Sequence, residues 1–417
     1  MSGQHTAQPT VLVTDADRGS ALAIIRSLGR RGWRVIAASG QRDSLGFRSR
    51  YVAERLVYPT SWHDPQQMVS TLLEAVRSQG VDLLIPVTDE VLLPLAAARH
   101  QFAGVCQVAI PDDAQLATVA DKWQTLTLAR ELDVPVPPSH RVETVAEAHA
   151  LAGEFSWPVV LKPQRSRLVE PQGGVDVLEV AYAASAADLV RVMSRFEGRC
   201  AVLLQEYCPG AGHGVELLAY QGHPIAAFQH QRLHEVPITG GASSLRQSVA
   251  LDPTLYEYAR RLVAALKWTG LIMVEFKVGP KGPQLMEING RIWGSLPLAV
   301  FSGMDFPLRL AELLLYGPSS LPAEPDTHYR VGVKARNLEK DIVWILAVLA
   351  GRRRYPFLVV PRRWEALTAL PGLLDPRIRT DTLTWDDPRP ALAELPKIVR
   401  KLLRKRANAS QDRGKTS

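Results

Sequence analysis

Three polar residues alternate with apolar ones in the stretch PQLMEINGRIWGS, residues 283–295, and they carry the chain's most informative pattern. Glu287, Asn289 and Arg291 stand at every second position. Side chains two residues apart share one face of a β-strand, so these three should project together, while Met286 and its apolar neighbours take the other face. An acid, an amide and a guanidinium on one face make a poor core but a plausible ligand platform.

A second acid is expected opposite Glu287. The stretch GLIMVEFKVGPKGPQLMEING, residues 270–290, predicts a hairpin, and taking GPKGP as a five-residue loop makes Val278 face Gln284 and Glu275 face Glu287. In that register the two Cβ atoms lie roughly 4.5–5.5 Å apart, and the like charges destabilise the hairpin unless a cation sits between them. Two carboxylates with an amide suit Mg²⁺, and the next guanidinium suits a phosphate or carboxylate. The alternative is a solvated hairpin face with scattered charges.

Other polar residues stand at the ends of predicted strands. Lys162 lies in the apolar stretch WPVVLKPQ, where it needs either a counter-anion or a route to solvent at the strand mouth. Gly173 and Gly174 suit either a mobile loop whose amides approach phosphate or an ordinary hairpin turn.

Two further stretches are candidates for ligand contact. The polar joint from Gln205 to Cys208 follows the predicted strand AVLLQ, and it either offers main-chain groups to a purine edge or simply ends the strand. The stretch HQRLHEVPITGGASSLRQS, residues 230–248, predicts a loop over a site, with Arg232 and Arg246 as candidate anion anchors and Ser243 as a further substrate contact.

The elements that position these residues begin with an alternation of strands and helices. VLVTDADRGS, ALAIIRSLGRRG and WRVIAAS predict strand, helix and strand, with Gly32 at the end of the helix. A second helix and strand follow, so a parallel sheet with covering helices is expected over roughly residues 10–115. The first turn lacks GxGxxG, and TDE at 88–90 fits either a ligand site at a strand end or a helix N-cap.

Composition narrows the function classes. The 417 residues are 46% hydrophobic and include three cysteines. An odd number of cysteines excludes a full disulfide framework and favours a cytoplasmic setting.

The net charge of +7 belongs to the C-terminal segment, because residues 341–417 hold 16 Lys or Arg against 8 Asp or Glu. No aromatic residue interleaves with the basic run KIVRKLLRKR, so nucleic acid is not expected as a partner. The alternatives for this segment are helices packed on the core with solvated basic faces, or peripheral docking on an anionic membrane.

These pieces, in this order, resemble the ATP-grasp superfamily, and more narrowly its carboxylate–amine ligase-like members, over roughly residues 10–315. The resemblance implies a Rossmann-like domain at 1–115, an ATP-grasp central lobe at 116–200, a C-terminal lobe with the Mg/ATP site at 201–320, and a basic, mainly helical extension at 321–417. The fold class implied is α/β, with α+β character in the core.

The resemblance also implies roles for individual residues, which follow the motifs VEF, MEINGR, VVLKP, DKWQT and QEY. Glu275, Glu287 and Asn289 would be metal ligands, and Arg291 and Lys162 would act on the transferring phosphoryl group. Nucleotide contacts would come from Lys122, Lys162, Gly173, Gly174, Gln205, Glu206, Tyr207, Cys208 and Glu216. Glu216 is included because His213 occupies the position at which family members commonly carry a ribose-binding acid.

The function implied is an ATP- and Mg²⁺-dependent ligase that joins a small-molecule carboxylate to an amine through an acyl phosphate, with Mn²⁺ as a substitute metal. An ATP-grasp phosphotransferase and a non-catalytic nucleotide-binding regulator are the alternatives. A homodimer is a further expectation for the partners.

Overall fold

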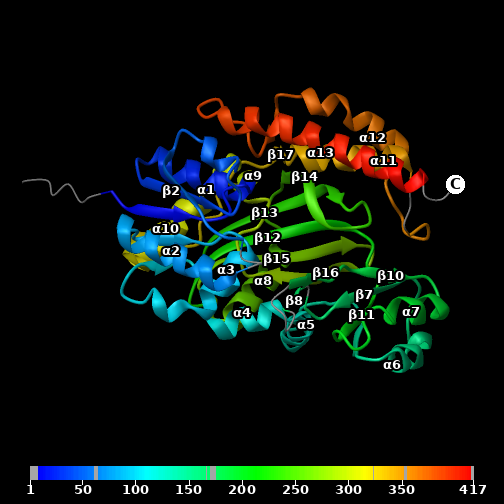
Figure 1. The fold of residues 1–417 in the computed structure, drawn as a ribbon. Helices are drawn as coiled ribbons and strands as arrows, with labels where there is room; N and C mark the ends of the chain where they lie inside the picture. The colour runs from blue at the N-terminus through cyan, green and yellow to red at the C-terminus, as the bar shows by residue number, and fades with distance from the viewer. Residues whose placement is uncertain are drawn as a thin grey trace, which may run out of the picture.

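The computed structural model describes residues 8–60, 64–165, 167–169, 175–322, 324–351 and 355–414. Four sheets are present in this part of the chain, with five, four, seven and two strands. Figure 1 shows the N-terminal sheet and the large sheet side by side, the four-stranded lobe below the far end of the large sheet, and the C-terminal helices along the top. Among the described residues, no helix combines the length and the apolar composition needed to cross a bilayer.

The N-terminal sheet is entirely parallel, with strand order β3-β2-β1-β4-β5, and it confirms the predicted alternation of strands and helices. Helix α1 is buried along nearly all of its length, and Gly32, with φ +81°, follows its end as predicted. The elements of this sheet and its helices are β1 (Thr10–Val13), α1 (Gly19–Arg30), β2 (Arg34–Ser39), β3 (Val52–Val57), α2 (Pro65–Gln79), β4 (Leu83–Ile85), α3 (Asp89–Ala97) and β5 (Gln107–Val108).

A smaller lobe follows two linking helices. Its antiparallel sheet has the order β10-β7-β11-β6, and α6 and α7 enclose an apolar core with it. Asp121 caps the second linking helix through its side chain, which fixes where that helix begins. The elements are α4 (Asp113–Ala120), α5 (Lys122–Glu131), β6 (Ser139–Val142), α6 (Val145–Ala150), β7 (Val159–Pro163), β8 (Arg167–Val169), β9 (Val175–Val177), β10 (Ala181–Ala183), α7 (Ala186–Met193) and β11 (Val202–Glu206).

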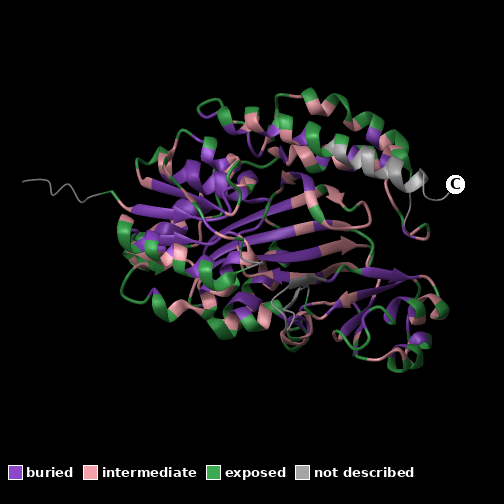
Figure 2. Ribbon diagram, viewed as in Figure 1, coloured by how far each residue is buried: buried purple, intermediate pink, exposed green. Residues whose placement is uncertain are grey.

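The seven-stranded sheet, with order β16-β15-β12-β13-β14-β17-β18, forms the body of the molecule. One of its faces packs on α1, α9 and α10, and the other packs on α8 and the linking helices. Figure 2 shows that its central strands are largely buried. The elements are β12 (Ala211–Tyr220), β13 (His223–Val236), β14 (Ala242–Ser248), α8 (Pro253–Ala265), β15 (Gly270–Gly279), β16 (Gly282–Asn289), α9 (Leu296–Ser302) and α10 (Phe306–Tyr316).

The C-terminal segment was expected to be a mainly helical extension, and the structure modifies that expectation. It does supply helices α11 (Leu338–Ala350), α12 (Arg363–Ala369) and α13 (Arg389–Gly414). It also supplies β17 (Lys334–Arg336) and β18 (Ile378–Thr380), which pair in parallel with each other and complete one edge of the seven-stranded sheet. The segment is therefore part of the main sheet and not an appendage to it.

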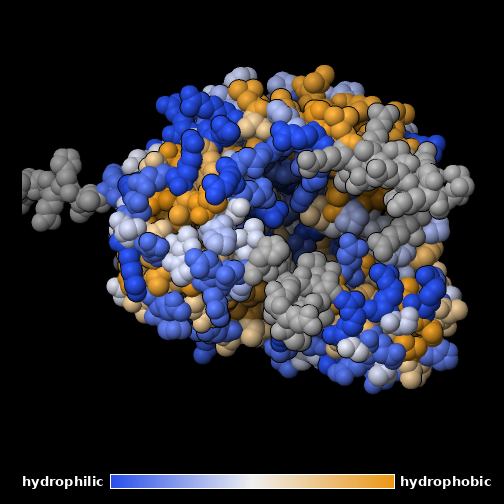
Figure 3. Space-filling view, viewed as in Figure 1, coloured by the Kyte–Doolittle hydropathy of each residue, from blue (hydrophilic) through white to orange (hydrophobic). Residues whose placement is uncertain are grey.

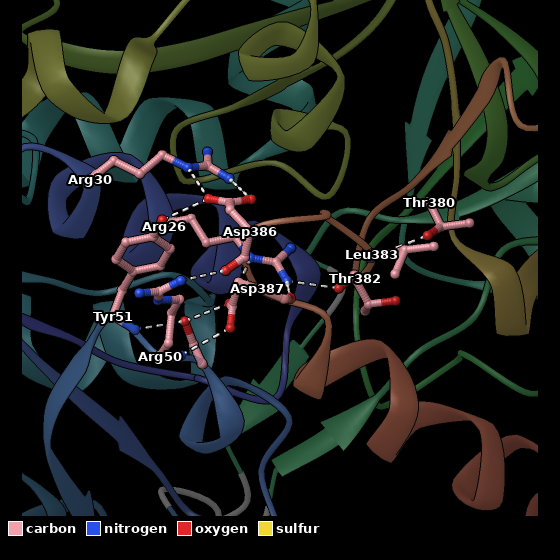
Figure 4. A network of polar contacts seen from close by, with 10 residues as sticks. Arg26, Arg30, Arg50, Tyr51, Thr380, Thr382, Leu383, Asp386 and Asp387 are labelled. Carbon is pink, nitrogen blue, oxygen red and sulfur yellow. Dashed lines mark hydrogen bonds and ion pairs between the residues drawn. The ribbon is translucent and has the colours of Figure 1, made fainter.

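A polar network fastens this segment to the N-terminal sheet (Figure 4). Arg26 donates from Nε to Asp387 Oδ2 at 3.0 Å, and Ser49 Oγ donates to the same oxygen at 2.7 Å. The neighbouring Asp386 accepts from Arg30 and from the Tyr51 hydroxyl nearer the surface. Because Arg26 and Asp387 are both buried, their charges satisfy each other in a place that water does not reach.

Candidate functional site

A cleft of about 860 Å³ opens where the three large sheets and the C-terminal segment meet. Figure 3 shows the hollow near the centre of this face, surrounded mainly by hydrophilic residues. Residues from the N-terminal sheet, the four-stranded lobe, the seven-stranded sheet and α11 and α13 all line it. Among the described residues, nearly every sequence stretch that was predicted to contact a ligand has residues that line this cleft.

The floor of the cleft is the outer part of strand β15. Leu271 and Met273 lie on one face of β15 and pack into the apolar core against α1 and α9. Glu275 and Lys277 continue the same face by period two, and both line the cleft. The face therefore changes from apolar to charged at the point where the core ends and the cleft begins.

Glu275 lies directly opposite Glu287 in the β15–β16 ladder, as predicted, although the predicted loop was wrong. The turn is tighter, with Gly279 paired to Gly282 and Val278 facing Pro283 instead of Gln284. A β-bulge at Met286 adds one residue to β16 and restores the pairing of the acids.

The bulge also decides which side chains reach the cleft. Leu285 packs in the core beneath the sheet beside Phe276, whereas Glu287, only two residues later, lines the cleft. Two residues of a regular strand would share a face, so the bulge is what permits this arrangement. Met286 lines the cleft as well, contrary to the prediction that it would face away from the acids.

The two acids share the Asn289 amide and differ in electrostatic environment. Asn289 Nδ2 donates to Glu275 Oε1 at 3.0 Å and to Glu287 Oε1 at 3.2 Å. Burial raises the pKa of Glu275, although the adjacent Arg232 guanidinium, which forms an ion pair with it, works against this. Burial would also raise the pKa of Glu287, but the positive charges of Lys122, Lys162 and Arg232 outweigh it and hold that pKa below its usual value.

This donor set fits a hard divalent cation. Carboxylate and amide oxygens are the ligands that Mg²⁺ prefers, and it commonly takes one or two carboxylates from a protein. Asn289 now turns its NH₂ group toward both acids, and with the amide turned over its oxygen takes that place. Among the described residues, no group of three or more His, Cys, Asp or Glu side chains is arranged to hold a metal, so the acid pair with its amide is the candidate.

Two lysines reach toward the acids from different elements. Lys162, on β7, lines the cleft, and burial lowers its pKa to about 8 while the charge of Glu287 acts in the opposite direction. Lys122 begins α5; burial lowers its pKa, and the charges of Glu287 and Asp121 raise it. Of the two alternatives for Lys162, the structure favours the counter-anion, because its ammonium lies in the field of the two acids.

Arg291 lies beyond the end of β16 and is held by the N-terminal sheet. Its Nε donates to Asp89 Oδ2 at 2.9 Å, and its Nη1 donates to the carbonyl of Ile292 at 3.0 Å. Asp89 belongs to the TDE stretch, in which Thr88 occupies the N-cap position of α3 but directs its hydroxyl to Asp15. Both interpretations of TDE therefore hold in part, since Thr88 precedes a helix and Asp89 lines the cleft.

The joint from Gln205 to Cys208 crosses one wall of the cleft, and all four residues line it. Gln205 pairs with Val160 across the sheet, and its side chain donates to Ser139 Oγ at 2.9 Å, so that side chain is structural. Glu206 bonds through its amide to Pro138 and through its carboxylate to Lys281. Tyr207 and Cys208 follow the end of β11, so their main-chain groups lie outside the ladder of that strand.

Two predicted ligand contacts are corrected by the structure. Glu216 is completely buried, accepts from Ser295 Oγ at 2.9 Å, lies 2.9 Å from His230 Nδ1, and does not line the cleft. Arg246 is also buried and pairs with Asp381 of the C-terminal segment, so it is a structural cation and not a free anion anchor. In both cases the partner lies far away in the sequence and could not be inferred from the local pattern.

The remaining predicted contacts divide into two groups. Arg232 and Ser243 both line the cleft, and Arg232 Nη1 also donates to the carbonyl of Gly241 at 3.0 Å, which fixes the turn between β13 and β14. Gly173 and Gly174 lie outside the described residues.

Several cleft residues had not been anticipated from the sequence. They come from the start of α1 and from the C-terminal segment, namely Asp17, Arg18, Asn337, Glu339, Lys340, Asp381, Thr382, Glu394, Lys397 and Lys401. The basic composition of the C-terminal segment was visible, but nothing in it indicated that part of it lines a ligand cleft. Asp89 was noticed as a strand-end residue without its role as the partner of Arg291.

Comparisons with known proteins agree with this architecture. Residues 199–337 match the family model described as ATP-grasp in the biosynthetic pathway with Ter operon. The L-amino acid ligase from Bacillus licheniformis superposes with a TM-score of 0.56 at 14% identity, covering 76% of this chain and 77% of that one. The biotin carboxylase domain of the Hydrogenobacter thermophilus 2-oxoglutarate carboxylase, whose structure contains MgADP and bicarbonate, gives 0.58 at 16%, covering 79% and 74%.

The chain therefore has the ATP-grasp fold, and its residues 199–337 match an ATP-grasp family model. Among curated proteins, carnosine synthase 1 from Gallus gallus is 33% identical over 138 residues, which are 30% of this chain and 14% of that protein. The chain spans between 14% and 23% of the length of three curated relatives that it matches.

Proposed function

We propose that the chain is an ATP- and Mg²⁺-dependent ligase that joins a carboxylate to an amine. The observation that carries this proposal is the opposed pair Glu275 and Glu287, which share Asn289 and face a polar cleft edged by Lys162 and Arg291. The coarser assignment, ATP-dependent ligation, agrees with the ligases and carboxylases that the chain resembles.

The nucleotide would lie along the cleft from the joint to the acids. The main-chain groups of Tyr207 and Cys208 would meet an adenine edge, and Val160, which also lines the cleft, would supply an apolar surface. The triphosphate would then extend over Glu275 and Glu287, with Lys162 and Lys122 offsetting its charge. A Mg²⁺ ion held by Glu275, Glu287 and Asn289 would stabilise negative charge on the phosphate oxygens.

The chain's residues would position the reactants in two steps. First, a substrate carboxylate oxygen attacks the γ-phosphorus, the bond to the β-phosphate oxygen breaks, and ADP leaves. Next, the amine nitrogen attacks the acyl carbon, the bond to the phosphate oxygen breaks, and inorganic phosphate leaves as the nitrogen loses a proton. Arg291 and Lys162 would stabilise charge on the transferring group, so no side-chain nucleophile is required.

The metal that could replace Mg²⁺, the oligomeric state and the substrates are still predictions. A Mn²⁺ ion would suit the same oxygen ligands, and the biotin carboxylase domain that superposes on this chain is described as a dimer. A homodimer and small-molecule carboxylate and amine substrates are the partners we propose, with no nucleic acid.

The test is ADP release from ATP with pooled carboxylates and amines, followed by mass spectrometry of the products. We expect an amide together with ADP and phosphate, and we expect Glu287→Gln to lower turnover on the order of a hundredfold or more without loss of the fold. A stable phosphorylated acceptor would identify a phosphotransferase instead. Nucleotide binding without turnover under all pools would favour the regulatory alternative, and unaffected turnover in Glu287→Gln would refute the metal assignment.

A further inference from the structure

The cleft continues past the two acids into an end that the proposed nucleotide path leaves open. Its walls come from segments far apart in the sequence: the start of α1, the start of α11, the residues after β18, and α13. Arg18 lies at the start of α1 and Lys340 lies in the first turn of α11, and both side chains line this end. We call it the C-terminal end of the cleft because most of its wall comes from residues 337–401.

The wall is held in place by close contacts. A Cβ atom on residue 19 would lie 3.0 Å from the Cβ of Asp381, so Gly19 allows the start of α1 to approach the end of β18 closely. A few residues later, the buried contacts of Arg26 and Ser49 with Asp387 fix the same segment on the N-terminal sheet (Figure 4). The C-terminal end of the cleft is therefore a built structure, in which side chains have defined neighbours.

The acids of this wall already have partners. Asp381 pairs with Arg246, Glu339 pairs with Lys401, and Lys397 lies 2.8 Å from Asp43. Glu394 accepts a hydrogen bond from Thr382 at 2.5 Å, and burial raises its pKa, which favours its neutral form. These contacts leave little negative charge free to face the cleft.

Two cations of this wall, Arg18 and Lys340, are less fully paired than its acids. Within the described part of the chain, the Lys340 ammonium has no side-chain hydrogen bond or ion pair, and the Arg18 guanidinium has a single ion pair, with Asp17 at 3.3 Å. Burial lowers the pKa of Lys340, and the nearby charges of Arg18 and Arg246 lower it further, while Asp381 and Glu339 act in the opposite direction. The first turn of α1, which has no side-chain cap, adds main-chain N–H groups to the same wall.

We propose that Arg18 and Lys340 bind an anionic group, a carboxylate or a phosphate, on the substrate whose reacting end lies over Glu275 and Glu287. A cation that lines a polar cleft and is weakly paired or unpaired lowers its energy by taking an anion, and charge-assisted hydrogen bonds make that contact strong. The inference rests on the proposed function only in calling the bound molecule a substrate. It predicts that substrates with a second anionic group are preferred over neutral analogues.

The test measures anion binding by calorimetry on protein saturated with Mg²⁺ and a non-hydrolysable ATP analogue, so that the triphosphate site is filled. Phosphate and succinate are titrated separately at constant ionic strength, which distinguishes the two sources of the anionic group. We expect Lys340→Met and Arg18→Met each to weaken the preferred anion roughly tenfold or more. Lys334→Met, a nearby lysine that does not line the cleft, serves as the matched control and should bind as wild type.

Two results would overturn the proposal: wild-type protein that binds neither anion at millimolar concentration, or Lys340→Met and Arg18→Met variants that bind as wild type does. The same titrations on nucleotide-free protein test the Lys340 site even if the ATP analogue fails to bind. Failure of the analogue to bind would count against the proposed ligase function and not against this site.

Discussion

Asp89 and Arg291 join two sheets across the cleft, with Asp89 Oδ2 accepting a hydrogen bond from Arg291 Nε at 2.9 Å. The carboxylate comes from the start of α3 in the N-terminal sheet, and the guanidinium follows the strand that carries Glu287 and Asn289. The N-terminal sheet thus sets the direction of a guanidinium that we place beside the transferring phosphoryl group.

We expect Asp89→Asn to lower turnover about tenfold while changing the affinity for a non-hydrolysable ATP analogue by a smaller factor, because Arg291 loses its orienting charge but remains in the cleft. Single-turnover rates and calorimetry separate the two effects. Asp113→Asn, which removes an exposed partner of Arg99, is the control. Wild-type turnover in Asp89→Asn would show that Arg291 does not depend on this contact.

Stability should depend on Asp387 far more than on its neighbour. The Asp387 side chain has no exposed surface and accepts from Arg26, Ser49 and the Arg50 amide, whereas the Asp386 side chain is 40% exposed. Asp387→Ala leaves the Arg26 charge buried without its partner, which should cost about 3–5 kcal/mol in the free energy of unfolding. Asp386→Ala should cost less than about 1 kcal/mol. Urea unfolding of both variants measures the difference, and equal losses would contradict the assignment.

Nucleotide affinity should fall at alkaline pH because of Lys162. Burial lowers the pKa of this lysine to about 8 in the free protein, and the protonated form is the one that attracts phosphate. Affinity for the Mg-bound ATP analogue should therefore be full below pH 8. Above that value binding must return a proton to the ammonium, so the dissociation constant should rise by up to about tenfold per pH unit.

Calorimetry between pH 7 and 9.5, in two buffers of different ionisation enthalpy, detects this proton uptake. The Lys162→Met variant should bind more weakly at pH 7 and show a flatter pH profile. A wild-type profile that stays level through pH 9 would contradict the role given to this lysine.

Docking of the C-terminal helices on a membrane is still a prediction, and the structure identifies the apolar residues that would make the contact. Leu392, Leu395, Val399 and Leu403 recur at helical spacing on α13 and are each more than half exposed. Lys397 and Lys401, by contrast, contact Asp43 and Glu339. Replacing Leu395, Val399 and Leu403 with serine should reduce co-sedimentation with vesicles containing anionic lipid about tenfold or more, because their apolar surface would no longer enter the interface.

Removing only these exposed side chains is a cleaner test than deleting residues 395–417, because Lys397 and Lys401 line the cleft. Equal vesicle binding by wild type and the triple serine variant, or no binding by either, would favour helices that simply pack on the core. Concentration-dependent association of the wild type without vesicles would point to a second copy of the chain on this stripe.

The sequence predicted the parallel N-terminal sheet and the opposed acids because both depend on local periodicity. The predicted pairing of Glu275 with Glu287 is correct, although the predicted loop is wrong. The turn is shorter than predicted, and the extra residue in the bulge at Met286 offsets the resulting change of register. Turn length and bulges depend on packing beneath the sheet, here on Leu285, and the period-two pattern does not record them.

The wrong predictions for Glu216 and Arg246, and the strands that were not predicted, have a different cause. Glu216 and Arg246 look like free polar groups in their own strands, but their partners Ser295 and Asp381 lie 79 and 135 residues away. The strands β17 and β18 have three residues each, too few for a periodic pattern. The part of the cleft that the C-terminal segment builds could therefore be recognised only once the chain was folded.

The position of β18 at the edge of the large sheet has a consequence for synthesis on the ribosome. Translation delivers the N-terminal sheet and most of the large sheet first, and domains generally begin to fold as they emerge. Arg26, Arg246 and the open edge of β17 must wait until residues 378–387 have been made before their partners arrive. A nascent chain that terminates early would therefore leave two buried arginines without counter-charges, so incomplete products should be marked for degradation by their own instability.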